Sequence, residues 1–231
     1  MNAPYPLAAV AELIGEPARA AILIALTDGR ALPAGELARA AGVSAQSASA
    51  HLSKLVGGGL LCVQSEGRHR YYAMASPEVG HAVEALGAIA TRPREPGVPH
   101  PLETRALYNL RSCYDHLAGR VAVELTSAFE KSRMIQLRGE RDYELGPEAP
   151  TGFEGLGLDT AALRRSRRRF ARRCLDWTER RPHIAGALGA AVFSRLIALG
   201  WVARLPHTRA LRITQRGAGE LERRFGILAR A

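Results

Sequence analysis

The 231-residue sequence lacks several features that would place it in a specialised class of protein. It has only three cysteines, Cys62, Cys113 and Cys174, and their wide spacing does not form a disulfide framework. Its longest apolar stretches, such as residues 184–193, are too short to span a bilayer. No basic segment precedes an apolar run near Met1, so we expect no signal peptide and a cytoplasmic protein that does not contact membranes.

Signatures of common enzyme classes are also missing. We find no glycine-rich phosphate loop, no metal-hydrolase motif and no nucleophile elbow. These absences favour a binding protein without catalytic residues. One enzymatic alternative stays open, a cysteine-dependent enzyme with Cys113 or Cys174 as nucleophile. Its general base would be His116 or His183.

Positive charge is abundant but unevenly distributed. The chain carries a net charge of +10, yet residues 1–90 hold six Arg or Lys against seven Asp or Glu. The remainder holds 26 basic and 15 acidic residues, and the run at residues 164–173 alone contains seven arginines. Such a run can track nucleic-acid phosphates, or it can form a solvated face of an arginine-rich protein. The sequence leaves both interpretations open.

The first third of the chain has the pattern of a helix-turn-helix followed by a β-wing. A short helix breaks at Gly42, and Ser44 is placed to N-cap a second helix over about residues 45–56. Two short apolar strands, near residues 60–64 and 68–73, follow a glycine cluster. A helix with small polar side chains fits a major groove, and wing arginines fit the minor groove or the DNA backbone. The pattern predicts binding to double-stranded DNA.

The exposed face of the second helix and the wing supply the candidate DNA contacts. These candidates are Gln46, Ser47, Ser49, Ser53, Lys54, Arg68, His69 and Arg70. His51 fits either the groove or a packing position, and we interpret Tyr71 and Tyr72 as structural. The helix is poor in Arg and Asn, so we expect affinity to depend also on the wing, a dimer and DNA shape.

These motifs, in this order, resemble the winged helix-turn-helix of the ArsR/SmtB-type bacterial repressors. The resemblance covers about residues 6–77 and includes EPARAAIL at 16–23, GELARAAG at 35–42 and EGRHRYY at 66–72. It implies a transcriptional repressor that binds a palindromic operator as a homodimer. It also implies that the first and last helices of the module form the dimer interface.

The metal sites usual in that family are not expected in this chain. Members that sense metals or arsenicals on the helix before the turn use a cysteine pair, and residues 36–39 contain none. Members that bind zinc between the last helices use a spaced Asp/His/Glu set. The corresponding segment here offers His81 and Glu84, too few donors for a four-coordinate site.

The predicted fold is mainly α with small β-wings, an α+β class. We assign residues 1–91 to the winged helix-turn-helix domain, 92–101 to a linker and 102–231 to a C-terminal effector or dimerisation domain. Four prolines and Gly97 mark the linker.

Within the C-terminal domain, periodicity predicts mainly helices. We expect one long helix over about residues 102–131, short strands near 134–137 and 143–145, and a loop at 146–157. An alanine-rich helix at 183–199, two strands and a closing helix repeat the winged pattern over residues 183–228. This second winged-helix-like module has few polar side chains for base edges, so we expect sensing or dimerisation from it.

A group of cysteine, histidine and aspartate residues in the C-terminal domain is the candidate effector site. It comprises Cys113, Asp115, His116, Cys174, Asp176 and His183. Two thiolates with one or two imidazoles suit zinc or another thiophilic metal, whereas two low-pKa thiols suit a redox switch. The cysteines also fit small buried hydrophobic positions. A metal, a redox signal, a small-molecule effector and the absence of any effector all remain open.

Overall fold

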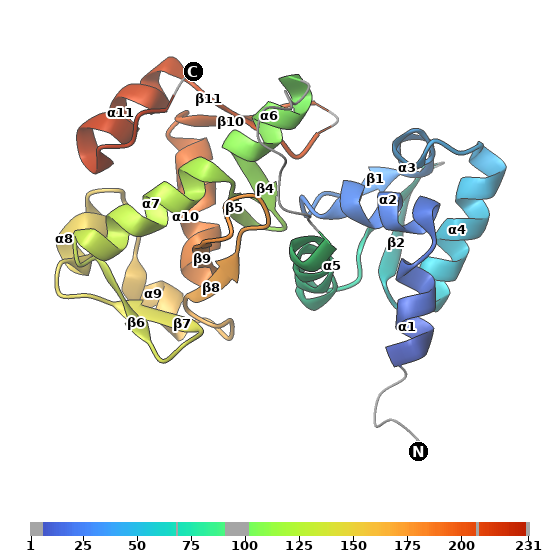
Figure 1. Cartoon of the computed structure of the whole chain (residues 1–231), viewed down its shortest axis with the longest axis horizontal. Coiled ribbons are helices and arrows are strands. Elements are labelled where there is room, and N and C mark those ends of the chain that lie inside the picture. Colours follow the sequence, from blue (N-terminus) through green and yellow to red (C-terminus); the bar gives the residue numbers. More distant parts are fainter. Residues whose placement is uncertain (1–6, 68, 91–101, 207, 230–231) are drawn as a thin grey trace. The chain divides into compact units, whose positions relative to one another are not determined.

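The computed structural model describes residues 7–67, 69–90, 102–206 and 208–229. The chain divides into two compact units, Met1–Leu86 and Gly87–Ala231 (Figure 1). The predicted linker at residues 92–101 lies outside the described residues.

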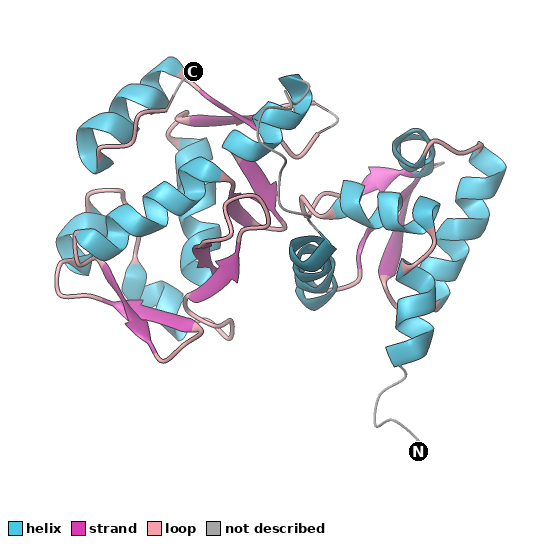
Figure 2. Ribbon diagram, in the orientation of Figure 1, coloured by secondary structure: helices cyan, strands magenta, loops and turns pink. Residues whose placement is uncertain are grey.

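The N-terminal unit contains the predicted helix-turn-helix and wing (Figure 2). Its elements are α1 (Leu7–Ile14), α2 (Pro17–Leu26), β1 (Leu32–Pro33), α3 (Ala34–Ala41), α4 (Ala45–Gly57), β2 (Leu61–Glu66), β3 (His69–Met74) and α5 (Pro77–Ala90), which continues past the unit boundary. The three strands form an antiparallel sheet in the order β1-β3-β2. The predicted helix at residues 45–56 and both predicted strands are confirmed. Each of their ends lies within two residues of the predicted position.

The turn between α3 and α4 follows from two residues. Gly42 ends α3 in the left-handed conformation at φ 65°, which glycine adopts without steric cost. Two residues later, the Ser44 hydroxyl accepts a hydrogen bond from the backbone N–H of Ser47 at 3.2 Å and so caps α4. Ile22, Leu37 and Leu52 are fully buried and pack α2, α3 and α4 together. Local signals therefore specify the motif.

The C-terminal unit is a mixed α+β structure. Its elements are α6 (Leu102–Asn109), β4 (Arg111–Cys113), β5 (His116–Ala118), α7 (Arg120–Lys131), β6 (Ile135–Arg138), β7 (Asp142–Leu145), α8 (Ala149–Glu154), α9 (Thr160–Arg165), β8 (Arg172–Leu175), β9 (Pro182–Ala185), α10 (Gly186–Ala198), β10 (Val202–Arg204), β11 (Leu211–Ile213) and α11 (Gln215–Phe225). Strands β6-β7-β8-β9 form one antiparallel sheet, and β4-β5 and β10-β11 form hairpins.

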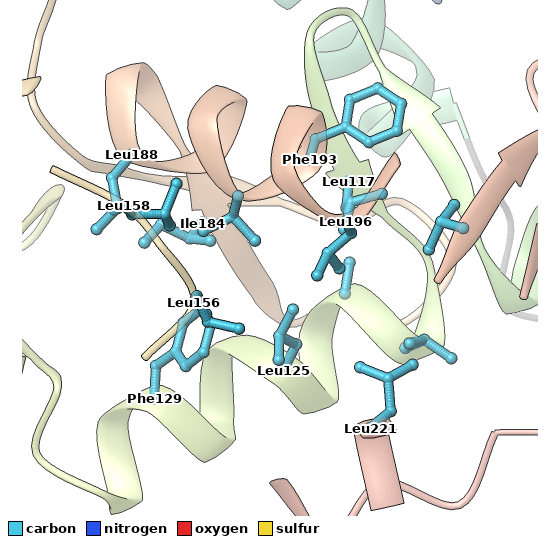
Figure 3. Close-up of a cluster of buried hydrophobic side chains, with 14 of the residues drawn as sticks. Leu117, Leu125, Phe129, Leu156, Leu158, Ile184, Leu188, Phe193, Leu196 and Leu221 are labelled. Atoms are coloured by element: carbon cyan, nitrogen blue, oxygen red, sulfur yellow. The ribbon is translucent and has the colours of Figure 1, made fainter. Parts of the chain in front are cut away.

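The core of this unit lies between its two longest helices. Figure 3 shows Leu125 and Phe129 of α7 facing Leu188 and Leu196 of α10. Leu221 of α11 closes the same cluster. Burying five such side chains contributes on the order of 10 kcal/mol of hydrophobic stabilisation. No helix in the described ranges is long and apolar enough to cross a membrane.

The predicted helix over residues 102–131 is wrong in its middle. Helix α6 ends at Asn109, the β4-β5 hairpin follows, and α7 begins only at Arg120. Gly119 adopts φ 91°, and a Cβ there would stand 2.8 Å from the carbonyl oxygen of Tyr108, so only glycine fits this turn. The apolar stripe that suggested one helix is divided between α6, the hairpin and α7.

Two other predictions for the C-terminal unit need correction. The predicted loop at residues 146–157 contains the short helix α8. The predicted helix at 183–199 begins only at Gly186, because Pro182–Ala185 pairs with β8 as strand β9. The predicted order of helix, two strands and closing helix is present as α10, β10, β11 and α11.

Candidate DNA interface and metal centre

Helix α4 presents a polar face on the side opposite to its buried residues. Ala48 and Leu52 are fully buried against the N-terminal unit, as the helical period requires. Gln46, Ser53 and Lys54 are exposed on the other side. Their spacing of seven and eight residues aligns them along one strip of the helix, the geometry that reading a groove requires.

The remaining candidates on α4 are partly engaged within the helix itself. The Ser49 hydroxyl donates to the carbonyl oxygen of Ala45 at 3.0 Å, and the Ser44 and Ser47 hydroxyls are 3.2 Å apart. Both candidate serines are exposed. A hydroxyl that donates to the backbone keeps its acceptor lone pairs for a base or phosphate partner.

His51 lies at a packing position. Its Nδ1 is 3.3 Å from a carboxylate oxygen of Glu16, and its side chain is 21% exposed. Glu16 also caps α2 by accepting from the backbone N–H groups of Ala18 and Arg19. The backbone N–H of Arg19 is the main cause of the lowered pKa of Glu16. His51 thus connects the recognition helix to the start of α2.

In the wing, Arg70 is exposed and pairs with Ser65 across β2 and β3. Tyr72 is buried and Tyr71 is half-buried, in agreement with a structural interpretation of both. Arg68 lies outside the described residues, as does the side chain of His69.

The effector candidates meet in the C-terminal unit on two hairpins, and Cys113 and His116 do not lie on a helix as predicted. Cys113 and His116 are directly opposite each other in the β4-β5 hairpin, across a two-residue turn. Cys174 and His183 are directly opposite each other in strands β8 and β9. Directly opposite residues of an antiparallel pair project from the same face with neighbouring Cβ atoms. Each hairpin therefore supplies one thiol and one imidazole.

The two cysteine–histidine pairs form one compact cluster. The four potential ligand atoms all lie within 4.8 Å of one another, and the two sulfur atoms are 4.0 Å apart. The two imidazole centroids are 5.1 Å apart. Cys113, His116 and His183 are buried, and Cys174 is half-buried. Among the described residues, this is the single cluster of three or more His, Cys, Asp or Glu donors.

The two aspartate candidates lie outside this cluster and orient its histidines. Asp115 places a carboxylate oxygen 3.3 Å from Nδ1 of His116, and Asp176 does the same at 3.3 Å from Nδ1 of His183. A carboxylate beside Nδ1 favours ligation through Nε2. Both ring nitrogens of His183 are buried and neither makes a hydrogen bond with a described residue, so its contact with Asp176 is an ion pair at 3.3 Å.

Asp176 is also the centre of a buried polar network that the sequence did not indicate. Its Oδ2 accepts from the Arg111 guanidinium at 3.0 Å and from the backbone N–H of Gly119 at 2.6 Å. Its Oδ1 accepts from the Thr178 hydroxyl and from the backbone N–H of Glu179. Arg111 and Asp176 are both 0% exposed. This ion pair connects the β4-β5 hairpin to the segment after β8.

Arg111 is held on its other side by an aromatic ring. Its guanidinium carbon lies 4.5 Å from the ring centroid of Trp177. Stacking of this kind stabilises a buried guanidinium that is cut off from water. Beyond the local order Asp176-Trp177-Thr178, the sequence carries no signal for the ion pair of Arg111 with Asp176. Arg111 is 65 residues away in the chain, so no local pattern joins the two.

The electrostatics of the cluster favour a thiolate. The Cys113 thiol holds the pKa of Cys174 well below its usual range, and the two imidazoles act in the same direction against burial. Burial disfavours the charged form of His183, but Asp176 and Cys174 raise its pKa to about 9. Burial likewise opposes ionisation of Asp176, yet His183 and Arg111 hold its pKa well below its usual range. A thiolate is the form that ligates metals and attacks electrophiles.

The third cysteine does not join the cluster. Cys62 lies in β2, and its sulfur is 3.6 Å from the carbonyl oxygen of Met74. The family positions at His81 and Glu84 are half-buried and buried on α5.

Comparison with known proteins agrees with the helix-turn-helix. A family model described as "Helix-turn-helix domain" matches residues 14–64. The "Uncharacterized HTH-type transcriptional regulator YdfF" of Bacillus subtilis (strain 168) is 40% identical over 221 residues, which cover 96% of this chain and 97% of the relative. The HTH-type transcriptional regulator CmtR of Mycobacterium tuberculosis (strain ATCC 25618 / H37Rv) is 40% identical over 83 residues, 36% of this chain and 67% of the relative.

Several solved structures match about a third of the chain. One of them, the homodimeric winged helix-turn-helix DNA-binding domain of Mb0332 from Mycobacterium bovis, described as a possible ArsR-family transcriptional regulator, is 30% identical. The match covers 36% of this chain and 77% of that chain, with a TM-score of 0.34.

The fold and these relatives together define a winged helix-turn-helix DNA-binding protein. The chain belongs to the HTH-type transcriptional regulators.

Proposed function

We propose that this protein is a cytoplasmic, homodimeric repressor whose DNA binding responds to a thiophilic metal ion held by the C-terminal unit. The observation that carries the effector proposal is the convergence of Cys113, His116, Cys174 and His183, with all four ligand atoms within 4.8 Å. The protein acts by binding DNA and metal, not by catalysis.

The arrangement of donors suits a tetrahedral ion. Zinc–sulfur bonds of about 2.3 Å at a tetrahedral angle place two sulfurs about 3.8 Å apart. The observed separation between Cys113 and Cys174 is 4.0 Å, so little movement is needed. Two thiolates and two neutral imidazoles form a donor set that selects zinc and other thiophilic ions over Mg²⁺ or Ca²⁺. The carboxylates of Asp115 and Asp176 complete the outer shell.

Support for the dimer comes from apolar side chains on the helices that the family resemblance assigns to that interface. Leu7 of α1 is 71% exposed, and Leu86 and Ile89 of α5 are 44% and 81% exposed. A second copy of the chain that covers these side chains would present two recognition helices to a palindromic site.

The metal proposal predicts one bound ion per chain. We expect Co²⁺, added to chelator-treated protein, to give thiolate-to-cobalt charge-transfer absorption, and Zn²⁺ to displace it. The Cys113→Ser/Cys174→Ser variant should lose affinity by roughly 100-fold or more, since even outer-shell changes cost about 10–100-fold. Cys62→Ser is the matched control and should bind as the wild type, because Cys62 lies outside the cluster.

The same variants connect the metal to DNA. Fluorescence anisotropy on DNA from upstream of the gene, against scrambled DNA, should show selective binding whose affinity changes when Zn²⁺ is added. The Cys113→Ser/Cys174→Ser protein should keep selective binding and lose the Zn²⁺ response. Wild-type Co²⁺ spectra in the double variant, or in His183→Gln, would exclude this metal site.

The short distance between the sulfurs also supports a second candidate, a redox signal. Hydrogen peroxide could oxidise the Cys113 and Cys174 thiols to a disulfide, with two electrons passing to the peroxide and two waters as product. The sulfurs would have to approach from 4.0 Å to about 2.05 Å. A thiol count that falls by two after peroxide, with a change in DNA affinity in metal-free protein, would favour this candidate.

The DNA interface makes a separate prediction. Lys54→Ala should weaken binding to selective and scrambled DNA alike and lower the salt slope by about 1, because Lys54 is an exposed cation on the polar face of α4. Arg68→Ala should also weaken binding, as the wing pattern predicts. Lys131→Ala is the control, since Lys131 is the other lysine of the chain and lies on α7. Unchanged affinity in both test variants would contradict the proposed docking.

A further inference from the structure

The C-terminal unit carries a basic concavity that the metal centre does not use. It has a volume of about 400 Å³ and is lined by Glu140, Arg141, Arg169, Arg172, Arg173, Leu175 and Pro182. Four arginines thus line the concavity together with one glutamate. We call these four arginines the basic surface.

Strands hold the basic surface in place. Arg172 and Arg173 belong to β8 and pair with Ala185 and Ile184 of β9, so their backbone positions are fixed by the sheet. Arg141 stands at the turn before β7, where Asp142 pairs with Arg172. Guanidinium groups on a rigid scaffold present their fork of donors to phosphate with little loss of conformational freedom.

Little of this positive charge is neutralised within the described part of the chain. Arg169 lies 3.9 Å from Asp142, a long contact between exposed groups. Arg173 donates to the backbone carbonyl of Glu140, which carries no charge. Arg141 and Arg172 form no ion pair with a described carboxylate. In contrast, Arg168 of the same run is paired with Asp115 at 2.6 Å.

The DNA-binding unit itself is short of positive charge. The first 90 residues carry a net charge of −1, and α4 contributes a single cation, Lys54. The sequence-independent part of DNA affinity comes from Lys and Arg that neutralise phosphates. A regulator of this kind needs that charge from elsewhere in the chain, and the C-terminal part carries a net +11.

We infer that the basic surface binds the phosphodiester backbone of DNA and supplies a sequence-independent share of the affinity. The inference rests on DNA binding by this regulator and is independent of the metal site. It assigns Arg141, Arg169, Arg172 and Arg173 to phosphate contacts, and it assigns Arg168 to the support of His116 through Asp115.

The salt dependence of DNA affinity tests this inference. With chelator-treated full-length protein and scrambled duplex DNA, the slope of log K against log salt should fall by about 2 in Arg141→Ala/Arg172→Ala. The control Arg212→Ala/Arg216→Ala removes two exposed arginines from β11 and α11 and should leave the slope unchanged. Tryptophan fluorescence checks that each variant is folded.

Two results would overturn the inference. The first is a slope in Arg141→Ala/Arg172→Ala equal to that of the wild type. The second is a fall of equal size in the control, which would show that net charge alone matters. In the first case, phosphate binding shows what the surface does instead. Saturable binding of inorganic phosphate by the wild type but not by the test variant would identify a small-anion pocket and exclude the DNA contact. Failure of the sequence-selective contacts would not mimic any of these outcomes, because scrambled DNA is used throughout.

Discussion

Replacement of Asp176 by Ala is expected to destabilise the C-terminal unit by about 3–5 kcal/mol. The substitution leaves the Arg111 guanidinium buried without its carboxylate partner, and it removes the acceptor of the Gly119 N–H. Urea unfolding followed by tryptophan fluorescence measures the loss, because both tryptophans, Trp177 and Trp201, belong to this unit.

Two further variants show whether this loss of stability comes from charge or from packing. Asp115→Ala should cost less than about 1 kcal/mol, because its ion pair with Arg168 is partly exposed. Adding Arg111→Met to Asp176→Ala should recover part of the lost stability, since it removes the uncompensated charge. A double variant less stable than Asp176→Ala would show that the pair acts through packing instead of charge.

The same carboxylate gives the wild type a characteristic pH dependence. The pKa of Asp176 is depressed in the folded state, so its contribution to the free energy of unfolding is complete above the unfolded pKa of about 4. The contribution is lost as the pH falls below that value. The Asp176→Ala variant should therefore lose less stability than the wild type between about pH 5 and pH 2.

Gly217→Ala is expected to destabilise the C-terminal unit by about 3 kcal/mol, while Gly219→Ala stabilises it by up to about 1 kcal/mol. A Cβ on Gly217 would lie 2.0 Å from the carbonyl oxygen of Trp201, and that carbonyl is fixed by its hydrogen bond from Thr214. A Cβ on Gly219 meets no atom within 4 Å. The two variants change the same helix by the same methyl group.

Urea unfolding of this pair measures how closely α11 packs on the preceding hairpin. Opposite signs of the change in unfolding free energy support the close backbone approach. Two changes of the same sign would show that the helix shifts to accommodate the methyl group at Gly217, and the contact with Trp201 would then be loose.

The N-terminal module could be predicted from sequence because its signals are local. The break at Gly42, the cap at Ser44 and the apolar period of α4 each act within a few residues. No long-range contact is needed to place the turn. The end of α3 at the Gly42 break was therefore predicted correctly, and the bounds of α4 to one residue.

The candidate metal centre was predicted in its residues but not in its geometry. Cys113 and His116 were expected one turn apart on a helix, whereas they pair across a hairpin. A helical turn and a two-residue hairpin both bring side chains three residues apart close together. Residue type and separation therefore did not distinguish a helix from a hairpin. In the structure the hairpin carries Arg111, whose buried ion pair with Asp176 is a contact across 65 residues. No local pattern reports a contact of that range.

The arginine run shows a related limit of sequence reasoning. The run is continuous in the sequence, yet its arginines lie in three different environments in the structure. Arg168 supports the cluster through Asp115, Arg164 lies over the ring of Phe170, and Arg172 and Arg173 belong to β8. The positions of Arg172 and Arg173 depend on the strand pairing of β8, which a run of like charges does not indicate.

Because the cluster needs both hairpins, it is completed late during synthesis of the chain. Cys113 and Cys174 are 61 residues apart, and the fourth member of the cluster is residue 183 of 231. Domains generally fold as units, beginning with the N-terminal one, while the chain is still being made. A nascent chain therefore has a complete helix-turn-helix well before it has a complete cysteine–histidine cluster. For that interval, the DNA-binding unit exists without the site proposed to regulate it.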